Sequence, residues 1–367
     1  MLNDMPLTNM KACIKYGLMI WCCLNANVLA QTGDCFDKSL QNINQQILIC
    51  KHYIKQFVVS HNMADTEVYK AHMQLASLYR QSGDLILSDK QLDLLDSAEL
   101  SQLQRYQVVR QQGINAYHNR NYLQSLALFN QAYQLSQQLK DIVLTAKSSN
   151  DLANTYQALG DLDTAVTLLL ESYNIAKQTN NLNRQAVALN NLGNIYRDIN
   201  QLDDAILSFR QAHQLHQQLQ NPKQTAHTLI SLAEVFFKKM HFDKAEQLLQ
   251  QQLTQLQANG LFIQLSRAYL ILAEIKLARN QLQQAQLLLA KQKQAAQLVQ
   301  SKTNNLRALL VEAKLKQLQG EHSQAQQLLE QGLQSQAAQH SQLAELFILR
   351  WHNLNAALVT TRQPLKP

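Results

Sequence analysis

Four asparagines form two pairs with helical spacing. Asn150 and Asn154 are four residues apart, and Asn190 and Asn194 repeat this spacing further along the chain. Residues four apart lie on one face of an α-helix, and a carboxamide offers a hydrogen-bond donor and an acceptor together. Such side chains can pair with the backbone of an extended peptide whatever its sequence. They can also bond only to a neighbouring helix or to water, so the spacing leaves both interpretations open.

Cationic and aromatic side chains accompany these pairs. Lys147 and Arg197 each lie three residues from an asparagine of a pair and could bind a carboxylate. Tyr117 and Phe237 lie at multiples of 40 residues from Arg197, and they would offer apolar anchors. The candidate binding residues are therefore Tyr117, Lys147, Asn150, Asn154, Asn190, Asn194, Arg197 and Phe237.

No pattern in the sequence indicates catalysis or metal binding. The motifs G-x-x-x-x-G-K-S/T, G-x-S-x-G and H-E-x-x-H are missing, as is a paired-carboxylate signature. His213 and His216 lie three residues apart and could form half a metal site, but a closed zinc site needs four ligands. We therefore expect a non-enzymatic protein with no metal and no cofactor.

The composition predicts the elements that would position these residues. The 367 residues include only 9 Gly and 4 Pro but 54 Gln, with abundant Leu and Ala. Few helix breakers and many straight-chain residues predict an all-α protein.

A repeat with a fixed 40-residue step runs through the helical region. A small residue recurs at this step at Gly113, Ala153, Gly193, Ala233, Ala273 and Ala313. Twelve residues after each lies a second small residue, and four residues further lies Phe or Leu. Two small residues allow two helices to pack closely, so each unit is predicted to be an antiparallel helix pair that must stack on its neighbours. Residues that tolerate the left-handed conformation separate the two helices, namely Gly83, Gly160, Asn200, Asn280 and Gly320.

The repeat resembles the tetratricopeptide repeat (TPR). Leu152-Ala153-Asn154-Thr155-Tyr156, with Gly160-Asp161-Leu162 and Ala165, carries the resemblance, and Leu192 to Tyr196 repeats it. The 40-residue step is similar to the long subclass found in kinesin light chain and in Leu-Gly-Asn repeat proteins. The resemblance covers residues 67–334, about seven units, and implies a right-handed superhelical solenoid. In the family, exposed positions of each first helix line the ligand groove, and the candidate binding residues occupy such positions.

Residues 1–30 have the pattern of a secretory signal peptide, with Met10 as the better start. A short basic stretch from Lys11 to Lys15 precedes an apolar run over residues 16–24, and Val28 and Ala30 are small residues at positions −3 and −1 before Gln31. The apolar run is too short for a membrane span, which needs roughly 20 residues. We expect cleavage after Ala30, a periplasmic or secreted protein, and no stable membrane span afterwards.

Cleavage would leave Cys35 and Cys50, an even number that suggests a disulfide in an oxidising compartment. However, apolar residues at 3–4 spacing predict one amphipathic helix over residues 36–57. Fifteen residues of helix would separate the two cysteines by roughly 22 Å, and a disulfide needs Cα atoms within about 7 Å. The bond therefore requires a break or fold-back before the helix. Otherwise Cys50 is a small buried apolar residue.

The remaining segments complete the domain organisation. Residues 31–66 are predicted to be an N-terminal helical segment, residues 335–360 a C-terminal capping helix, and residues 361–367 a tail. The net charge of +7 is modest and the basic residues form no stripe. We therefore do not expect nucleic-acid binding.

Together these features predict an exported scaffold or adaptor that binds an extended peptide or a partner protein in a concave groove. The alternative is a sensory region whose output domain, a caspase-like peptidase, a kinase or a diguanylate cyclase, lies on another chain or is missing. This alternative rests on the resemblance, because exported bacterial TPR chains are often similar to the sensor halves of larger proteins. A third interpretation is a cytosolic repeat protein that regulates transcription. Cleavage before Gln31 would exclude this interpretation.

Overall fold

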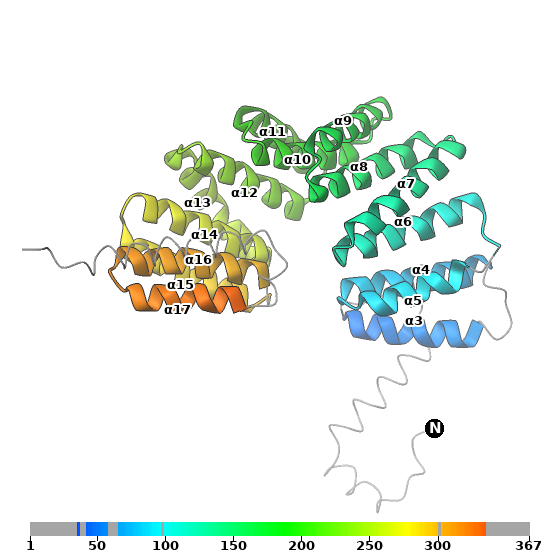
Figure 1. The fold of residues 1–367 in the computed structure, drawn as a ribbon, viewed down its shortest axis with the longest axis horizontal. Helices are drawn as coiled ribbons and strands as arrows, with labels where there is room; N and C mark the ends of the chain where they lie inside the picture. The colour runs from blue at the N-terminus through cyan, green and yellow to red at the C-terminus, as the bar shows by residue number, and fades with distance from the viewer. Residues whose placement is uncertain (1–34, 37–41, 58–64, 97–98, 300–301, 335–367) are drawn as a thin grey trace, which may run out of the picture. The chain divides into compact units, whose positions relative to one another are not determined.

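The fold is an all-α array of helix pairs, as predicted. The computed structural model describes residues 35–36, 42–57, 65–96, 99–299 and 302–334, and these contain fifteen α-helices and no strand (Figure 1). The chain divides into two compact units, residues 1–175 and 176–367. The predicted signal peptide (1–30), capping helix (335–360) and tail (361–367) lie outside the described residues.

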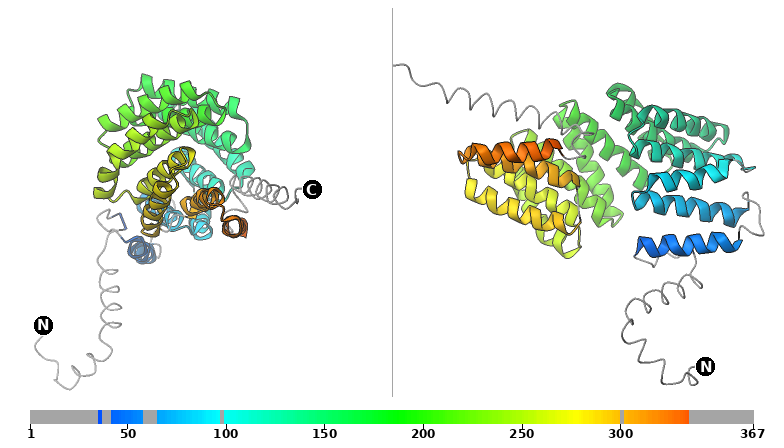
Figure 2. Two further views of the ribbon diagram at one scale, coloured as in Figure 1. Left: turned by 90° about the vertical axis from the view of Figure 1, so that its left-hand side faces the viewer. Right: turned by 60° about the horizontal axis from the view of Figure 1, so that its bottom comes forward.

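The helices have nearly uniform length. The first unit contains α3 (Ile43–Phe57), α4 (Thr66–Gln81), α5 (Leu85–Asp96), α6 (Gln102–His118), α7 (Tyr122–Gln138) and α8 (Ile142–Leu159). The next helix, α9 (Leu162–Gln178), contains the boundary between the units. The second unit continues with α10 (Leu182–Asp198), α11 (Leu202–Gln218), α12 (Pro222–Lys238), α13 (Phe242–Ala258), α14 (Phe262–Ala278), α15 (Leu282–Gln297), α16 (Lys302–Leu318) and α17 (His322–Gln334). From α4/α5 to α16/α17 consecutive helices form antiparallel pairs, and Figure 2 shows α3 to α8 as successive layers of the first unit.

The turns between helices recur at a constant interval. From residue 120 to residue 280, every twentieth residue has a positive φ, between +52° and +89°. Gly160 and Asn200 tolerate this left-handed conformation, as predicted, but Lys140 and Met240 adopt it too. A left-handed non-glycine residue costs about 1–2 kcal/mol. Here the constant length of the packed helices imposes the turn, whichever residue stands there.

The recurring small and large residues form the contact inside each helix pair. Ala153 on α8 and Ala165 on α9 are fully buried, and so is Leu169, which fills the space beside them. The equivalent alanines of the other pairs are buried as well, so the prediction from the 40-residue step is confirmed. Where the second small residue is serine, its hydroxyl donates to the backbone of the first small residue. Ser125 Oγ bonds the carbonyl oxygen of Gly113 at 3.0 Å.

Glycine at the first small position is always paired with phenylalanine at the large position. Gly113 lies against the Phe129 ring and Gly193 against the Phe209 ring. A Cβ added at Gly193 would lie 2.8 Å from Cε1 of Phe209, closer than carbon atoms can approach. The other pairs combine alanine with leucine, as in Ala233 with Leu249. The missing methyl group therefore makes room for the larger ring.

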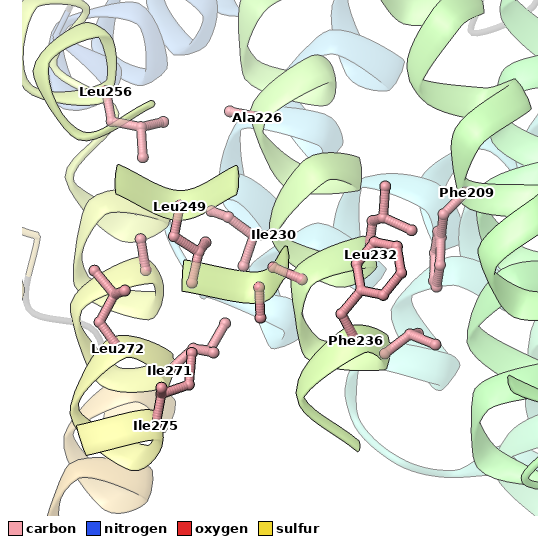
Figure 3. Packing of buried hydrophobic residues seen from close by; sticks show 14 of the residues in the cluster. Phe209, Ala226, Ile230, Leu232, Phe236, Leu249, Leu256, Ile271, Leu272 and Ile275 are labelled. Atoms are coloured by element: carbon pink, nitrogen blue, oxygen red, sulfur yellow. The ribbon is translucent and has the colours of Figure 1, made fainter. Parts of the chain in front are cut away.

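The largest core cluster of the described residues lies in the second unit, on helices α11 to α14 with Ala295 of α15. Figure 3 shows Phe209 beside Leu232 and Phe236, with Ile230 and Leu249 facing α14. The residues from α14 are Leu265, Ala268, Ile271, Leu272 and Ile275. Because this core runs continuously from α11 to α14, the helix pairs to which these helices belong bury their apolar faces against one another.

The structure corrects the predicted helix over residues 36–57. The described helix α3 begins at Ile43, and Cys35 and Phe36 lie in a turn before it. The chain folds back there, so the Cα atoms of Cys35 and Cys50 are 4.4 Å apart and the two residues form a disulfide. Both cysteines are buried against α4, near Ala71 and Leu75. The 3–4 spacing at Phe36 reflects packing of this turn on the helix and not continuation of the helix.

Candidate ligand-binding surfaces of the two units

In the second unit, the first helices of successive pairs contact one another. α10 contacts α12, α12 contacts α14, and α14 contacts α16. α11, α13 and α15 are second helices, and each packs between two first helices, as α11 does between α10 and α12. Because the first helices approach each other, the faces of these helices that do not pack against other helices form the inner surface of this unit. The predicted binding positions lie on first helices, namely α6 and α8 in the first unit and α10 and α12 in the second.

Each predicted pair of asparagines lies on one helix. Asn150 and Asn154 are half-buried on α8 in the first unit, and Asn190 and Asn194 are half-buried on α10 in the second. The hydroxyl of Thr228 on α12 donates to Oδ1 of Asn190 at 3.2 Å. Asn190 therefore bonds to a neighbouring helix, which is one of the two interpretations left open. Its amide nitrogen can still donate to a ligand. A continuous ladder of all four asparagines stays a prediction, because the two pairs belong to different units.

The predicted apolar anchors are partly used in packing. The ring centroids of Tyr117 and Tyr122 are 5.5 Å apart, and those of Phe237 and Phe242 are 5.6 Å apart. Burial, followed by the nearby Tyr122, raises the pKa of the Tyr117 hydroxyl, so it stays protonated and able to donate. Both anchors are half-buried, so only part of each ring is open to a ligand.

Leucines occupy the corresponding positions of the later pairs and pack within the array. Leu270 and Leu277 of α14 lie in one cluster with Val311 and Leu315 of α16. Leu310 lies in another cluster with Leu329 of α17. This part of the inner helices is therefore committed to the core.

A charged cluster, the Glu234 cluster, lies on the inner helices of the second unit. It consists of Glu234 and His227 on α12, Arg197 on α10, Arg267 on α14 and Arg307 on α16. One carboxylate oxygen of Glu234 is 3.1 Å from a guanidinium nitrogen of Arg197. The other oxygen is 2.8 Å from Arg267 and 3.4 Å from Arg307. Side chains from four successive first helices therefore meet at one carboxylate.

The cluster is partly desolvated, and this determines the protonation of its members. Burial alone would raise the pKa of Glu234, but the charges of Arg267, Arg307 and Arg197 outweigh it and lower this pKa. Burial, followed by the charge of Arg267, lowers the pKa of His227 to about 4. At neutral pH the carboxylate is therefore ionised and the imidazole is neutral. A ring nitrogen of His227 lies 3.3 Å from a guanidinium nitrogen of Arg267 and can accept its hydrogen bond.

We expect the Glu234 cluster to make the second unit sensitive to acid. Both lowered pKa values favour the folded state at higher pH, since the unfolded chain binds more protons as the pH falls. Stability should decline first between about pH 6.5 and 4, where His227 would titrate in the unfolded chain, and then further as Glu234 is protonated. Glu234→Gln should be about 1–3 kcal/mol less stable at pH 7, because it leaves guanidinium groups without their counter-charge. Its stability should also depend less on pH below 5.

Thermal unfolding of the wild type and Glu234→Gln from pH 3 to pH 8 measures both effects. Asp203→Asn is the matched control, because Asp203 carries an exposed carboxylate that pairs only with Lys239 among the described residues. Parallel pH profiles for the wild type and Glu234→Gln would contradict this assignment.

The first unit has an ion pair between two inner helices. The guanidinium of Arg110 on α6 contacts both carboxylate oxygens of Asp151 on α8, one of them at 3.1 Å. These side chains are only 15% and 11% exposed. Arg80 on α4 donates to Gln111, and burial together with the charge of Arg110 lowers the pKa of Arg80. A two-point guanidinium–carboxylate pair fixes the position of one helix against the next.

No group of three potential metal ligands occurs among the described residues. His213 contacts the backbone carbonyl of Thr225 at 3.3 Å, and His216 is buried on α11. No helix in the described ranges combines the length and apolarity that crossing a bilayer requires.

Comparison with known families identifies the array. A model of the MalT-like TPR region matches residues 145–363, and a second tetratricopeptide repeat model matches residues 106–178. The first match alone covers more than half of the chain. The chain belongs to the MalT-like TPR family. No curated protein matches the sequence.

Solved TPR structures share the fold at low sequence identity. A Rap protein complexed with competence and sporulation factor is 13% identical, with a TM-score of 0.60 over 87% of this chain and 94% of that one. The apo form of the quorum sensor NprR from B. thuringiensis is 13% identical, with a TM-score of 0.63 over 85% and 88%. A signal transduction ATPase with a TPR sensor, from Pyrococcus horikoshii, is 11% identical, with a TM-score of 0.60 over 78% and 44%. At these identities the likeness establishes the TPR fold alone.

Sequence reasoning selected Arg197 but missed the rest of the Glu234 cluster. The 40-residue step contained the signal, because Glu234 occupies the position of Asn154 and Asn194. Arg267 and Arg307 likewise occupy the position of Lys147. What the step does not show is that long side chains from different TPR units converge on one carboxylate.

Proposed function

We propose that this TPR protein is an exported, non-enzymatic scaffold that binds an extended peptide or a segment of a partner protein along its first helices. The TPR fold supports a protein-interaction scaffold. We add to this the binding surface on the first helices, an extended peptide as the ligand, and an exported location. The observation that carries it is the pair of asparagines on the inner helix α10, which offers carboxamides at a spacing of one helical turn. A Rap protein of similar fold was solved in complex with competence and sporulation factor, which supports a bound ligand here.

The disulfide between Cys35 and Cys50 supports export. Disulfides persist in oxidising compartments and are rare in the cytosol, and both cysteines lie in the part of the chain that cleavage after Ala30 would leave. If residues 1–30 are removed on export, the mature protein begins at Gln31. Sequencing the N-terminus of the exported protein tests this, and a mature protein that retains residues 16–24 would contradict it.

Alanine substitutions of the asparagines test the binding surface. Peptides selected on the wild type from a displayed random library serve as probes, and their affinities are measured by titration calorimetry. We expect Asn190→Ala/Asn194→Ala to weaken binding about tenfold or more, since each lost hydrogen bond contributes about 1 kcal/mol. Asn150→Ala/Asn154→Ala should act similarly on peptides bound by the first unit.

A matched control removes carboxamides of the same spacing from a second helix. Gln214 and Gln218 are exposed on α11 and lie four residues apart, as the asparagines do. Gln214→Ala/Gln218→Ala should leave peptide affinity unchanged. Equal affinity for the wild type and the asparagine variants would exclude the inner asparagines as the binding surface.

The second candidate function is a sensory role for a separate output domain. Two proteins of similar fold favour it, because one is described as a quorum sensor and the other carries a TPR sensor within a signal transduction ATPase. Genomic context distinguishes the two functions. A neighbouring gene for a peptidase, kinase or cyclase that lacks its own sensor would favour the sensory role, and the absence of one would favour the scaffold.

A further inference from the structure

The Glu234 cluster has the geometry of a carboxylate-binding site that is only partly filled. Arg267 and Arg307 share a single oxygen of Glu234, at 2.8 and 3.4 Å. A guanidinium has five N–H donors and usually engages a carboxylate through two of them. In the described part of the chain, Arg307 makes one hydrogen bond, and its acceptor is Glu234. The Arg307 side chain is also 46% exposed and so is accessible to a ligand.

Glu234 itself shows which chemistry these arginines accept. Its carboxylate lies among three guanidinium groups from α10, α14 and α16 and holds them near one another despite their mutual repulsion. Arg197 has a further carboxylate partner, Asp198, at 3.2 Å, whereas Arg307 has none among the residues that the structure describes. A second carboxylate beside Arg307 and Arg267 would use the donors that Glu234 leaves unused, in a partly desolvated place where such bonds are stronger than in water.

The cluster adjoins the proposed peptide-binding asparagines. Arg197 lies one helical turn after Asn194 on α10 and contacts Glu234 directly. Glu234 occupies on α12 the repeat position that Asn194 occupies on α10. A segment held by Asn190 and Asn194 and continuing towards α12 would therefore bring its next side chains to the cluster.

We propose that Arg267 and Arg307, positioned by Glu234, bind an acidic side chain of the ligand and so give this scaffold a preference for peptides containing Asp or Glu. The proposal rests on the proposed function and adds the chemical class of the ligand. Glu234 is a positioning residue, because it acts by holding the arginines, while Arg267 and Arg307 contact the ligand.

The test compares two versions of each library-selected peptide, one with Glu and one with Gln at the acidic position, both acetylated and amidated at their ends. We expect the wild type to prefer the Glu version about tenfold or more. Arg307→Gln should weaken binding of the Glu version until the two versions bind alike. Lys291→Gln, which removes an exposed cation from the second helix α15, should keep the preference. Asn190→Ala/Asn194→Ala should weaken both versions alike.

The outcomes separate the inference from the function on which it rests. Selected peptides without Asp or Glu, or a Glu preference that survives Arg307→Gln, would overturn the acidic-ligand assignment and leave the scaffold function standing. Binding only by peptides with an unmodified C-terminus would show that the chain terminus is the ligand and would overturn the side-chain assignment. If no peptide is selected on the wild type, both proposals fail. Inorganic phosphate that competes as well as free glutamate would show a general anion site and would also overturn the carboxylate assignment.

Discussion

Replacing both cysteines of the disulfide, Cys35→Ala/Cys50→Ala, is expected to lower the free energy of unfolding of the N-terminal part by about 3 kcal/mol. The bond closes a loop of 15 residues, and the loss of chain entropy in the unfolded state predicts a stabilisation of about this size. The effect should be local. In a stacked array each element contacts mainly its neighbours, and the disulfide ties the turn before α3 to the layer that packs on α4.

Hydrogen exchange measures this local effect better than a single melting temperature. In the double variant, amides of α3 and of the facing turn of α4 should exchange faster, while amides of α12 to α14 should be unchanged. Reducing the wild type with a thiol should reproduce the difference, and the variant should not respond to the thiol. Wild-type α3 that exchanges equally fast with and without reductant would show that the bond does not stabilise this segment.

Gly193→Ala is expected to destabilise the second unit, although alanine is the better helix former. The added methyl group would lie 2.8 Å from the ring of Phe209, which is fully buried. Overpacking of this kind costs about 1–3 kcal/mol, and the gain in helix propensity is only about 1 kcal/mol. Phe209→Leu alone should also destabilise, because it leaves a cavity.

The double variant Gly193→Ala/Phe209→Leu should recover much of this loss. It recreates the alanine–leucine pair that Ala233 and Leu249 form in the next repeat. The double-mutant cycle, measured by denaturant unfolding, should give a favourable coupling of about 2 kcal/mol, within the range for residues in direct contact. Ala233→Gly is the control, because it loses helix propensity without relieving any clash. Additive effects of the two single changes would refute the proposed exchange of volume between these positions.

The sequence alone determined the repeat, its period and the class of fold. Helix pairing follows from local preferences and from the spacing of small and large residues, as at Ala153 and Leu169. This spacing recurs in every 40-residue repeat. Because each helix packs mainly against its neighbours in sequence, the pattern of one repeat predicts the contacts of the next. The left-handed turns at Gly160 and Asn200 were predictable because glycine and asparagine tolerate this conformation. Those at Lys140 and Met240 were not, since helix length and not residue preference imposes them.

Tertiary structure alone decided which side chains meet. The fold-back that joins Cys35 to Cys50 depends on a break before α3 that the apolar spacing at Phe36 concealed. The meeting of Arg307 with Glu234, two repeats away in the chain, depends on the approach of successive inner helices and on the reach of an arginine side chain. Periodicity describes the position of a residue within its own repeat. Contacts between long polar side chains depend on the distance between repeats, which is set by the packing of the whole unit.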